Sequence, residues 1–411
     1  MADTATERLG PLAGVKVLDM ARFISGPLCA MVLGDWGADV IKVERPTGED
    51  ARHYPLQYAG DSLYSLTYNR NKRGIGLDLR NPEALPILER LVAWSDVVVE
   101  NFRPGTLDRM GLGLQRLRAI NEGVIVVSIS GFGQTGPWRD RPLFDAIAQA
   151  MSGMMSLTGE ADGRPTMTGT YTADHTTALW ACVGALLALY HRSETGVGQN
   201  VDVGMLDGMF ATLGVAATAY LNTGLVMTRT GNRDALTTPG NTFPTRDGHV
   251  YIDAGSDAMF KRLCEAMRRP DLSKAERFRS NDDRRANVES LESEIADWTG
   301  EHKSEEVCAT LARVGVPAGS VSDVQEVADA PQTLARDMVI ERDLRGARLR
   351  LAGIPVKLSV TPGSVRRSPP AIGEDSRAIL REICRLPDGE IDLLEANHVI
   401  SAAGQLGERW K

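Results

Sequence analysis

The sequence lacks the features that mark a secreted, membrane-spanning or metal-binding protein. Its 411 residues include five cysteines with no CxxC pair and six dispersed histidines, which argues against a disulfide framework and a zinc site. No apolar run is long enough to span a bilayer. The first residues, MADTATERLGPLAG, contain no apolar core behind a basic segment. We therefore expect a cytoplasmic protein with neither a membrane span nor a bound metal.

Long blocks of like charge are also missing. The formal net charge of -8 comes from interspersed acids and bases, so the chain has no electrostatic footprint for nucleic acid. Hydrophobic residues make up 43% of the sequence. A chain of this length and composition buries a large core and is expected to divide into two or three domains.

Short apolar, β-branched runs alternate with helical patterns in the first part of the chain. This alternation predicts a Rossmann-like α/β domain, in which helices cover both faces of a parallel sheet. The first connecting helix is expected to begin near Ser25-Gly26-Pro27 and to end before Gly37. The predicted strands are residues 15–18, 40–43, 75–79, 97–99 and 124–129.

The chain changes character near residues 221–244, which are rich in Thr, Gly and Asn. A strand over 249–252 then opens a smaller α/β unit with charged amphipathic helices. From Pro331 the sequence indicates an extended connection, followed by a last helix over 375–383. We predict a large domain from residues 1–220, a small domain from 225–325, and a C-terminal part, 330–411, that completes the large domain.

One segment imitates a dinucleotide-binding fingerprint. Residues 131–136, GFGQTG, follow a predicted strand and satisfy G-x-G-x-x-G. That motif binds a pyrophosphate only where a helix begins within it. The next residues, PWRDRP, contain two prolines and oppose helix initiation. We therefore expect a loop and no nicotinamide cofactor.

The longest helical pattern runs from Asp174 to His191 and is apolar around most of its circumference, which predicts a buried helix. An aspartate directly before such a helix is a preferred N-cap, and the pattern alone favours this structural role. Capping and catalysis are compatible, because a helix N-terminus can keep a carboxylate ionised and stabilise an oxyanion. Successive residues of a helix point about 100° apart around its axis, so His175 is not expected to form a dyad with Asp174.

Three arginines are each placed near a predicted strand end or loop, and open α/β sheets bind ligands at the carboxyl ends of their strands. Individually, Arg45, Arg80 and Arg109 are typical solvated surface charges. Together they are suited to a ligand with several phosphates, because guanidinium groups bind phosphate in a bidentate manner.

Several long, ordered segments give the chain a resemblance to a known family, the family III CoA-transferases, which include formyl-CoA transferase and carnitine CoA-transferase. The resemblance covers nearly the whole chain. It is carried by PLAGVKVLDM, FISGPLCAMVLGDWGADVIKVERP, NRNKRGIGLDLR, ENFRPGTLDRMGLG, SGFGQTGP, FDAIAQAMSG, GRPTMTGTYTAD, GVGQNVDVGMLDG and GVPAGSVSDVQEV.

The resemblance implies that Asp174, which closes the G-x-x-x-x-D stretch after Gly169, is the catalytic nucleophile. It also implies coenzyme A thioesters as substrates, no further cofactor, and an interlocked homodimer. The glycine run of the formyl-CoA branch is replaced here by LTTPGN, which argues against oxalate as a substrate. We expect succinyl-CoA or another dicarboxylyl-CoA as the donor and a carboxylic acid as the acceptor, because branches of the family that use such substrates fit at least as well. The residues it places at CoA are Phe23, Ile24, Ser25, Arg45, Leu77, Arg80 and Arg109.

Two alternatives remain open on the sequence. An α-methylacyl-CoA racemase resembles this family and uses a histidine before the aspartate of the FDAIAQ segment. Phe144 stands there and cannot exchange a proton, which disfavours racemisation. In a noncatalytic CoA-binding protein, Asp174 would be a cap only.

Overall fold

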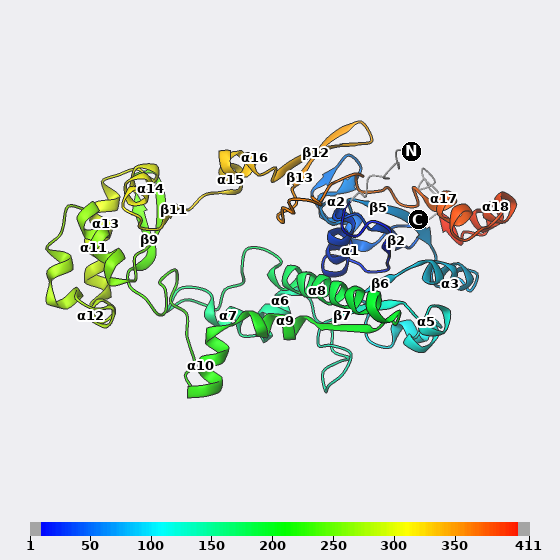
Figure 1. The fold of residues 1–411 in the computed structure, drawn as a ribbon, viewed down its shortest axis with the longest axis horizontal. Helices are drawn as coiled ribbons and strands as arrows, with labels where there is room; N and C mark the ends of the chain where they lie inside the picture. Colours follow the sequence, from blue (N-terminus) through cyan, green and yellow to red (C-terminus); the bar gives the residue numbers. More distant parts are fainter. Residues whose placement is uncertain (1–9, 402–411) are drawn as a thin grey trace. The chain divides into compact units, whose positions relative to one another are not determined.

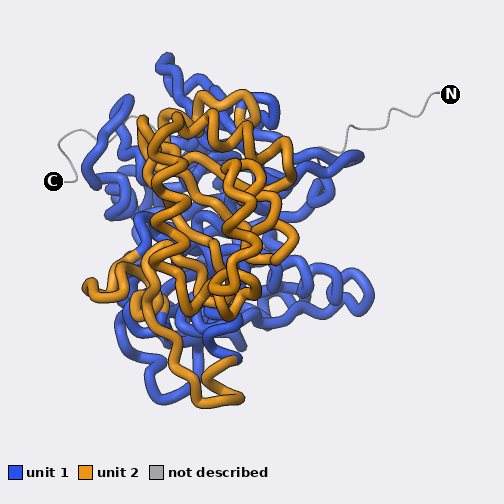
Figure 2. The backbone as a smooth tube through the Cα atoms, turned by 90° about the vertical axis from the view of Figure 1, so that its left-hand side faces the viewer, with its two compact units in different colours: residues 1–153, 168–218, 334–411 blue, residues 154–167, 219–333 orange. Residues whose placement is uncertain are grey.

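The computed structural model describes residues 10–401 (Figure 1). The chain forms two compact units (Figure 2). The larger unit combines residues 1–153, 168–218 and 334–411, and the smaller combines 154–167 and 219–333. The short segment 154–167 thus belongs with the smaller unit, although the sequence predicted it within a large domain of residues 1–220.

A seven-stranded sheet forms the centre of the larger unit, in the order β14-β5-β2-β1-β6-β7-β8. All neighbouring strands are parallel except β14, which pairs antiparallel with β5. The five strands predicted in the first part of the chain are confirmed, whereas β8 and β14 were not predicted. The strands are β1 (Lys16–Asp19), β2 (Asp39–Glu44), β5 (Lys72–Leu77), β6 (Val97–Glu100), β7 (Ile125–Ser130), β8 (Asn200–Gly204) and β14 (Ile400–Ser401).

Helices cover both faces of this sheet, as the apolar strands require. On one face α1 and α8 pack against Val17, Val40 and Val99. On the other, α3, α5, α17 and α18 pack against Leu18, Ile41 and Ile75. These helices are α1 (Ser25–Asp35), α3 (Ala84–Trp94), α5 (Leu114–Ile120), α8 (Thr172–Thr195), α17 (Ser376–Glu382) and α18 (Asp388–Ala396).

Shorter elements complete the larger unit. The segment from Pro331, which was expected to be extended, instead contains α16 (Pro331–Ala335), which runs across the boundary between the units, and an antiparallel hairpin of β12 and β13. The remaining elements are η1 (Asp50–His53), β3 (Gln57–Tyr58), β4 (Asp61–Ser62), α2 (Leu63–Tyr68), α4 (Thr106–Arg109), α6 (Asp145–Met151), α9 (Met205–Thr212), β12 (Val339–Leu344) and β13 (Ala347–Ala352); α10 (Val215–Thr223) runs across the boundary between the units.

The smaller unit is a three-stranded antiparallel sheet, β11-β10-β9, with helices around it. Its core includes Phe243, Val250, Phe260 and Leu291. The strand predicted over 249–252 is confirmed as part of β10. The elements are α7 (Met154–Leu157), β9 (Gly240–Thr245), β10 (Gly248–Asp253), α11 (Asp257–Ala266), η2 (Leu272–Lys274), η3 (Glu276–Phe278), α12 (Asn281–Ala286), α13 (Val288–Gly300), α14 (Ser304–Arg313), β11 (Ala318–Ser320) and α15 (Val324–Asp329).

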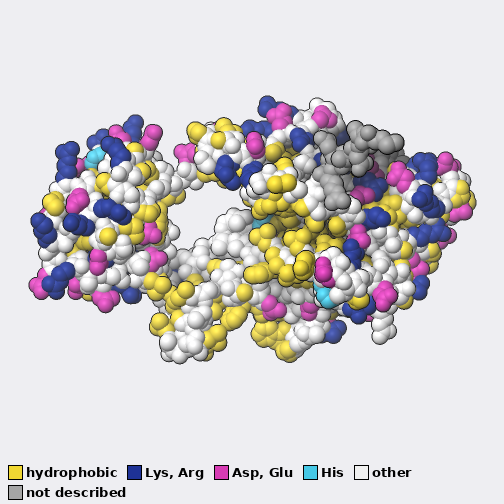
Figure 3. Space-filling model, in the orientation of Figure 1, with side chains coloured by type: hydrophobic (Ala, Val, Ile, Leu, Met, Phe, Trp, Pro, Cys, Tyr) yellow, Lys and Arg dark blue, Asp and Glu magenta, His cyan; other side chains and the backbone are white. Residues whose placement is uncertain are grey.

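The apolar helix α8 is buried along one face only. Ala178, Ala181, Ala185 and Ala188 have at most 1% of their surface exposed. A second stripe is exposed in the single chain, and Figure 3 shows hydrophobic side chains gathered over α8. The prediction of a buried helix therefore holds for one face of α8 in the single chain and not for the other. The exposed residues are Leu179, Trp180, Val183, Leu186, Leu187 and Tyr190.

Candidate active site

The turn between β1 and α1 supplies hydrogen-bond donors at the carboxyl edge of the sheet. Ser25 is the first residue of α1 and is buried. Its hydroxyl and its backbone N–H face the carboxylate of Asp174 and lower the pKa of that group. The first N–H groups of a helix have no partner within the helix, so they are available to an anion. The carboxylate of Asp174 therefore lies at the N-terminus of α1 as well as in the first turn of α8.

Asp174 does not cap α8. The helix begins at Thr172, and the cap position is occupied by Tyr171, which makes no side-chain cap. The capping carboxylate comes instead from Asp145, whose Oδ1 accepts the N–H groups of Ala173 at 2.7 Å and Asp174 at 3.1 Å. The predicted N-cap role of Asp174 is thus wrong, because an acid from another helix takes the donors that Asp174 was expected to satisfy.

Asp145 is a residue of the site that the sequence did not reveal. It is the first residue of α6 and is buried. Its Oδ2 accepts a hydrogen bond from the Gln149 amide at 2.6 Å. Its position in FDAIAQ carries no local signal for this role, since its partners on α8 lie 28 and 29 residues later in the chain.

The ionisation of Asp174 reflects a competition. Burial, together with the negative charge of Asp145, raises the pKa of Asp174 to about 6, and the hydroxyl and backbone N–H of Ser25 act in the opposite direction. The expectation that a helix N-terminus keeps this carboxylate fully charged is therefore too simple, because desolvation outweighs the donors. Above pH 6 the ionised form predominates, and the side chain is only partly buried. A substrate can thus reach the carboxylate of Asp174, and the donors beside it can stabilise an oxyanion.

Aromatic side chains surround this carboxylate. Burial and the charge of Asp174 raise the pKa of Tyr64 and raise that of Tyr68 to about 12, which keeps both hydroxyls protonated. The Tyr64 ring packs edge-on against Tyr68 and Tyr171, with centroids 5.9 and 5.7 Å apart. Neutral phenols of this kind can donate hydrogen bonds to an anionic substrate.

His175 belongs to this aromatic wall. Its Nδ1 lies 2.7 Å from the carbonyl oxygen of Tyr171, and its Nε2 lies 3.3 Å from the Tyr68 hydroxyl. Because a carbonyl only accepts, Nδ1 carries a proton. Both ring nitrogens therefore have partners other than Asp174, in agreement with the sequence argument against a dyad.

The residues that the family resemblance places at CoA divide into two groups. Phe23 and Ser25 lie in the β1–α1 turn, and Phe23 contacts the exposed ring of Phe144, with centroids 5.9 Å apart. Ile24 and Leu77 have no exposed surface. Their side chains are part of the core, so a ligand can reach only their backbone atoms.

The three predicted arginines follow β2, β5 and β6 at the carboxyl edge of the sheet. Arg45 donates to the Gly48 carbonyl and forms an ion pair with Asp50. Arg80 is exposed, and Arg109 is exposed with a 2.8 Å hydrogen bond to the Thr106 hydroxyl. Arg45 and Arg80 thus come soon after the ends of β2 and β5, whereas Arg109 is the last residue of the short helix α4.

The GFGQTG segment is a loop. No helix begins between the end of β7 at Ser130 and the start of α6 at Asp145. The loop is held by Asp202, whose carboxylate oxygens both accept the Gln134 N–H at 3.0 Å. The segment is thus a loop, as predicted, and lacks the helix start that a dinucleotide-binding motif requires.

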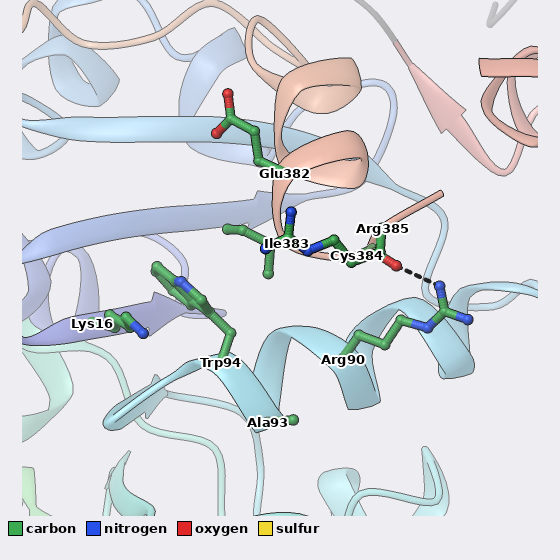
Figure 4. Close-up of a pocket in the computed structure, with 8 residues that line it drawn as sticks. All are labelled: Lys16, Arg90, Ala93, Trp94, Glu382, Ile383, Cys384 and Arg385. Atoms are coloured by element: carbon green, nitrogen blue, oxygen red, sulfur yellow. Dashed lines mark hydrogen bonds between the residues drawn. The ribbon is translucent and has the colours of Figure 1, made fainter. Parts of the chain in front are cut away.

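A surface pocket of about 710 Å³ lies elsewhere in the larger unit (Figure 4). Lys16 stands at the start of β1, and Arg90 and Trp94 come from the end of α3. The Arg90 guanidinium donates to the Cys384 carbonyl. This pocket therefore lies at the amino edge of the sheet, opposite the edge that carries Ser25.

Two further observations concern the described part of the chain. Across residues 10–401, no three His, Cys, Asp or Glu side chains are grouped so that they could hold a metal ion. Within the same residues, none of the helices has the length and apolar character needed to cross a membrane.

The fold and the site together define an α/β protein that presents a carboxylate and oxyanion donors at the carboxyl edge of a parallel sheet. The family model of CoA-transferase family III matches residues 12–376, and the chain belongs to this family. It is a CoA-transferase. The resemblance inferred from the sequence is thereby confirmed.

Individual relatives align over most of their length. A succinyl-CoA–D-citramalate CoA-transferase of Chloroflexus aurantiacus is 38% identical over 95% of this chain and 98% of its own. A succinyl-CoA:mesaconate CoA-transferase of Haloarcula hispanica is 40% identical over 91% of this chain and 96% of its own. The crystal structure of a CaiB/BaiF family protein from Brucella suis superposes with a TM-score of 0.83 at 38% identity, covering 91% of this chain and 99% of that one.

Proposed function

We propose that the chain moves CoA from succinyl-CoA, or another dicarboxylyl-CoA, to a carboxylic acid acceptor, with Asp174 as the covalent nucleophile. The single observation that carries this proposal is the position of the partly buried Asp174 carboxylate at the start of α1, where the hydroxyl and N–H of Ser25 lower its pKa. The donor class is supported by the two aligned relatives, whose names both specify succinyl-CoA.

In the first half-reaction, one carboxylate oxygen of Asp174 attacks the thioester carbonyl carbon of the donor. The carbon–sulfur bond breaks, CoA leaves as a thiolate, and a mixed anhydride remains on Asp174. The thiolate then attacks the aspartyl carbonyl carbon. The anhydride bond breaks, the donor acid leaves as a carboxylate, and Asp174 holds CoA as a thioester.

In the second half-reaction, the acceptor carboxylate attacks the aspartyl thioester and displaces the thiolate. The thiolate then attacks the acceptor carbonyl of the new anhydride, which releases the acyl-CoA product and the free carboxylate of Asp174. No net proton is consumed, and the scheme requires no cofactor beyond the CoA thioesters.

The donors of Ser25 serve the steps that occur at the aspartyl carbonyl. When one oxygen of Asp174 forms the anhydride, the other becomes a carbonyl oxygen within reach of Ser25. It gains negative charge each time a nucleophile adds to that carbon, and preorganised donors stabilise such an oxyanion. The removal of one donor of this kind lowers kcat by about 100-fold to 1000-fold.

The carboxyl edge of the sheet is the proposed binding site for CoA. Phe23, Ser25 and the backbone of Ile24 and Leu77 would line its channel, and the arginines would neutralise its phosphates. The three cations are Arg45, Arg80 and Arg109.

We also propose that the chain forms a homodimer. The exposed stripe of α8 places six large apolar side chains in water, among them Leu187 at 65% and Tyr190 at 72% exposure. A patch of this kind on a long helix is typical of a protein interface. A second copy is the partner that the proposal names.

Trapping of the acyl-enzyme tests the mechanism. Hydroxylamine or borohydride added with succinyl-CoA should modify Asp174, as seen by peptide mass spectrometry, and should leave it unmodified without acyl-CoA. The Asp174→Ala variant should lose transfer activity, and unchanged activity would refute the proposal. A panel of acceptor acids, followed by mass spectrometry, identifies the second substrate.

The racemase alternative has a separate readout. Phe144 occupies the position before Asp145, and its ring offers no proton. Incubation of 2-methylacyl-CoA in deuterated water should therefore give no α-deuterium incorporation, while CoA transfer proceeds with a succinyl donor.

A further inference from the structure

Four charged side chains are buried under the β1–α1 turn, and none takes part in the proposed chemistry. This buried charge cluster consists of Asp19, Lys42, Glu49 and Lys72, each with at most 3% of its surface exposed. Lys72 Nζ lies 2.8 Å from Asp19 Oδ2, and Lys42 Nζ lies 3.1 Å from Glu49 Oε1. Lys42 is also 4.0 Å from Asp19, which joins the two pairs.

Each member of the cluster also bonds to backbone atoms of the turn or of the first turn of α1. Asp19 accepts the Ala21 N–H at 3.0 Å, and Lys42 donates to the Ala21 carbonyl at 2.9 Å. Glu49 Oε2 accepts the Phe23 N–H at 2.7 Å, and Lys72 donates to the Pro27 carbonyl at 2.8 Å. The cluster thus holds the turn on both sides of Ser25.

The turn needs such support. Phe23 has a φ of 66°, a left-handed conformation that costs a non-glycine residue free energy and persists only when its surroundings impose it. The bond from its N–H to Glu49 fixes this conformation two residues before Ser25. A buried ion pair by itself adds little stability, since desolvation offsets most of the attraction. The cluster is therefore better explained by the geometry that it imposes than by the stability that it provides.

We propose that the buried charge cluster positions the β1–α1 turn so that the N–H and hydroxyl of Ser25 point at Asp174. This role rests on the proposed function of Asp174 as the nucleophile. The four residues are positioning residues, because they reach the reacting carboxylate only through the backbone of the turn.

The other end of α1 provides a matched control. Arg70 is buried, its Nη2 lies 2.7 Å from Asp35 Oδ2, and it donates to the Ala352 carbonyl. Asp35 is the last residue of α1 and Ser25 is the first. At 1.5 Å per residue, about 15 Å separates them. Arg70→Met therefore removes a buried cation of similar kind without touching the turn.

The test compares Lys72→Met with Arg70→Met. Both variants are expected to lower the midpoint of thermal unfolding. In single-turnover trapping with succinyl-CoA, Lys72→Met should form the Asp174 adduct at least about tenfold more slowly, because the oxyanion donors are displaced. Arg70→Met should stay within about twofold of wild type. Equal adduct rates in wild type and a folded Lys72→Met would overturn the positioning role.

A milder variant covers the case in which Lys72→Met does not fold. Glu49 uses one oxygen for Lys42 and the other for the Phe23 N–H, so Glu49→Gln must present its NH2 group to one of these donors. We expect slower adduct formation with little change in KM for succinyl-CoA. An unchanged rate in this folded variant counts against the proposal.

A double-variant cycle separates positioning from general damage. If the cluster acts through Ser25, Ser25→Ala combined with Glu49→Gln should lose less activity than the product of the two single losses. A loss equal to that product contradicts the proposal. If wild type itself forms no adduct at Asp174, the proposed function fails and the positioning role fails with it. An adduct in wild type with unaffected variants overturns the positioning role alone.

Discussion

Replacement of the nucleophile should make the protein more stable at neutral pH while it removes the activity. In the folded chain, burial and the charge of Asp145 raise the pKa of Asp174 from its ordinary value of 3.8 to about 6. A carboxyl with a raised folded pKa binds its proton more tightly in the folded state than in the unfolded state. The ionised form therefore costs stability, fully above pH 6 and progressively less as the pH falls toward 3.8.

The size of this cost follows from the two pKa values. It amounts to about 3 kcal/mol at pH 8 and to about 1–2 kcal/mol at pH 5, as an upper limit. Asp174→Asn removes the charge and keeps an oxygen that can accept the Ser25 donors. We expect the variant to unfold at higher urea concentration than wild type, with a larger difference at pH 8 than at pH 5.

Urea unfolding at the two pH values measures this difference. Glu122→Gln is the matched control, since it removes the same charge from an exposed position and should change the free energy of unfolding by less than about 0.5 kcal/mol. If Asp174→Asn is no more stable than wild type at pH 8, or gains equally at both pH values, then Asp174 does not carry a buried charge in the folded chain.

Three other predictions follow from the site. The kcat/KM for succinyl-CoA should fall about tenfold per pH unit below pH 6, because only the ionised form of Asp174 attacks the thioester. Ser25→Ala should shift this fall to higher pH, since the hydroxyl no longer stabilises the ionised carboxylate. An unshifted pH profile of kcat/KM would contradict the interaction between Ser25 and Asp174. Asp145→Ala should lower the free energy of unfolding by about 1–3 kcal/mol, since buried N–H groups of α8 lose their acceptor. An unchanged free energy of unfolding in urea titration would contradict the capping role of Asp145. Leu187→Arg should convert the proposed dimer to monomers in sedimentation velocity, and a persistent dimer would place the interface elsewhere.

The sheet was predictable because its strands obey local rules. Buried parallel strands are continuous apolar runs, and those of β1, β2 and β7 stand out between helical patterns. The short edge strand β14 has only two residues and pairs with β5 from more than 300 residues away. No local pattern indicates such a pairing, so this element was missed.

The sequence by itself determined the family, the parallel sheet and Asp174 as the expected nucleophile. Long ordered segments identified the family, and the pattern of apolar runs between helical segments predicted the sheet. Only the tertiary structure decided what surrounds that carboxylate. It assigned the cap of α8 to Asp145, gave Asp174 the donors of α1, and buried it enough to raise its pKa to about 6. These contacts join residues far apart in the chain, and the balance of desolvation, charge and hydrogen bonding exists only once those residues are brought together.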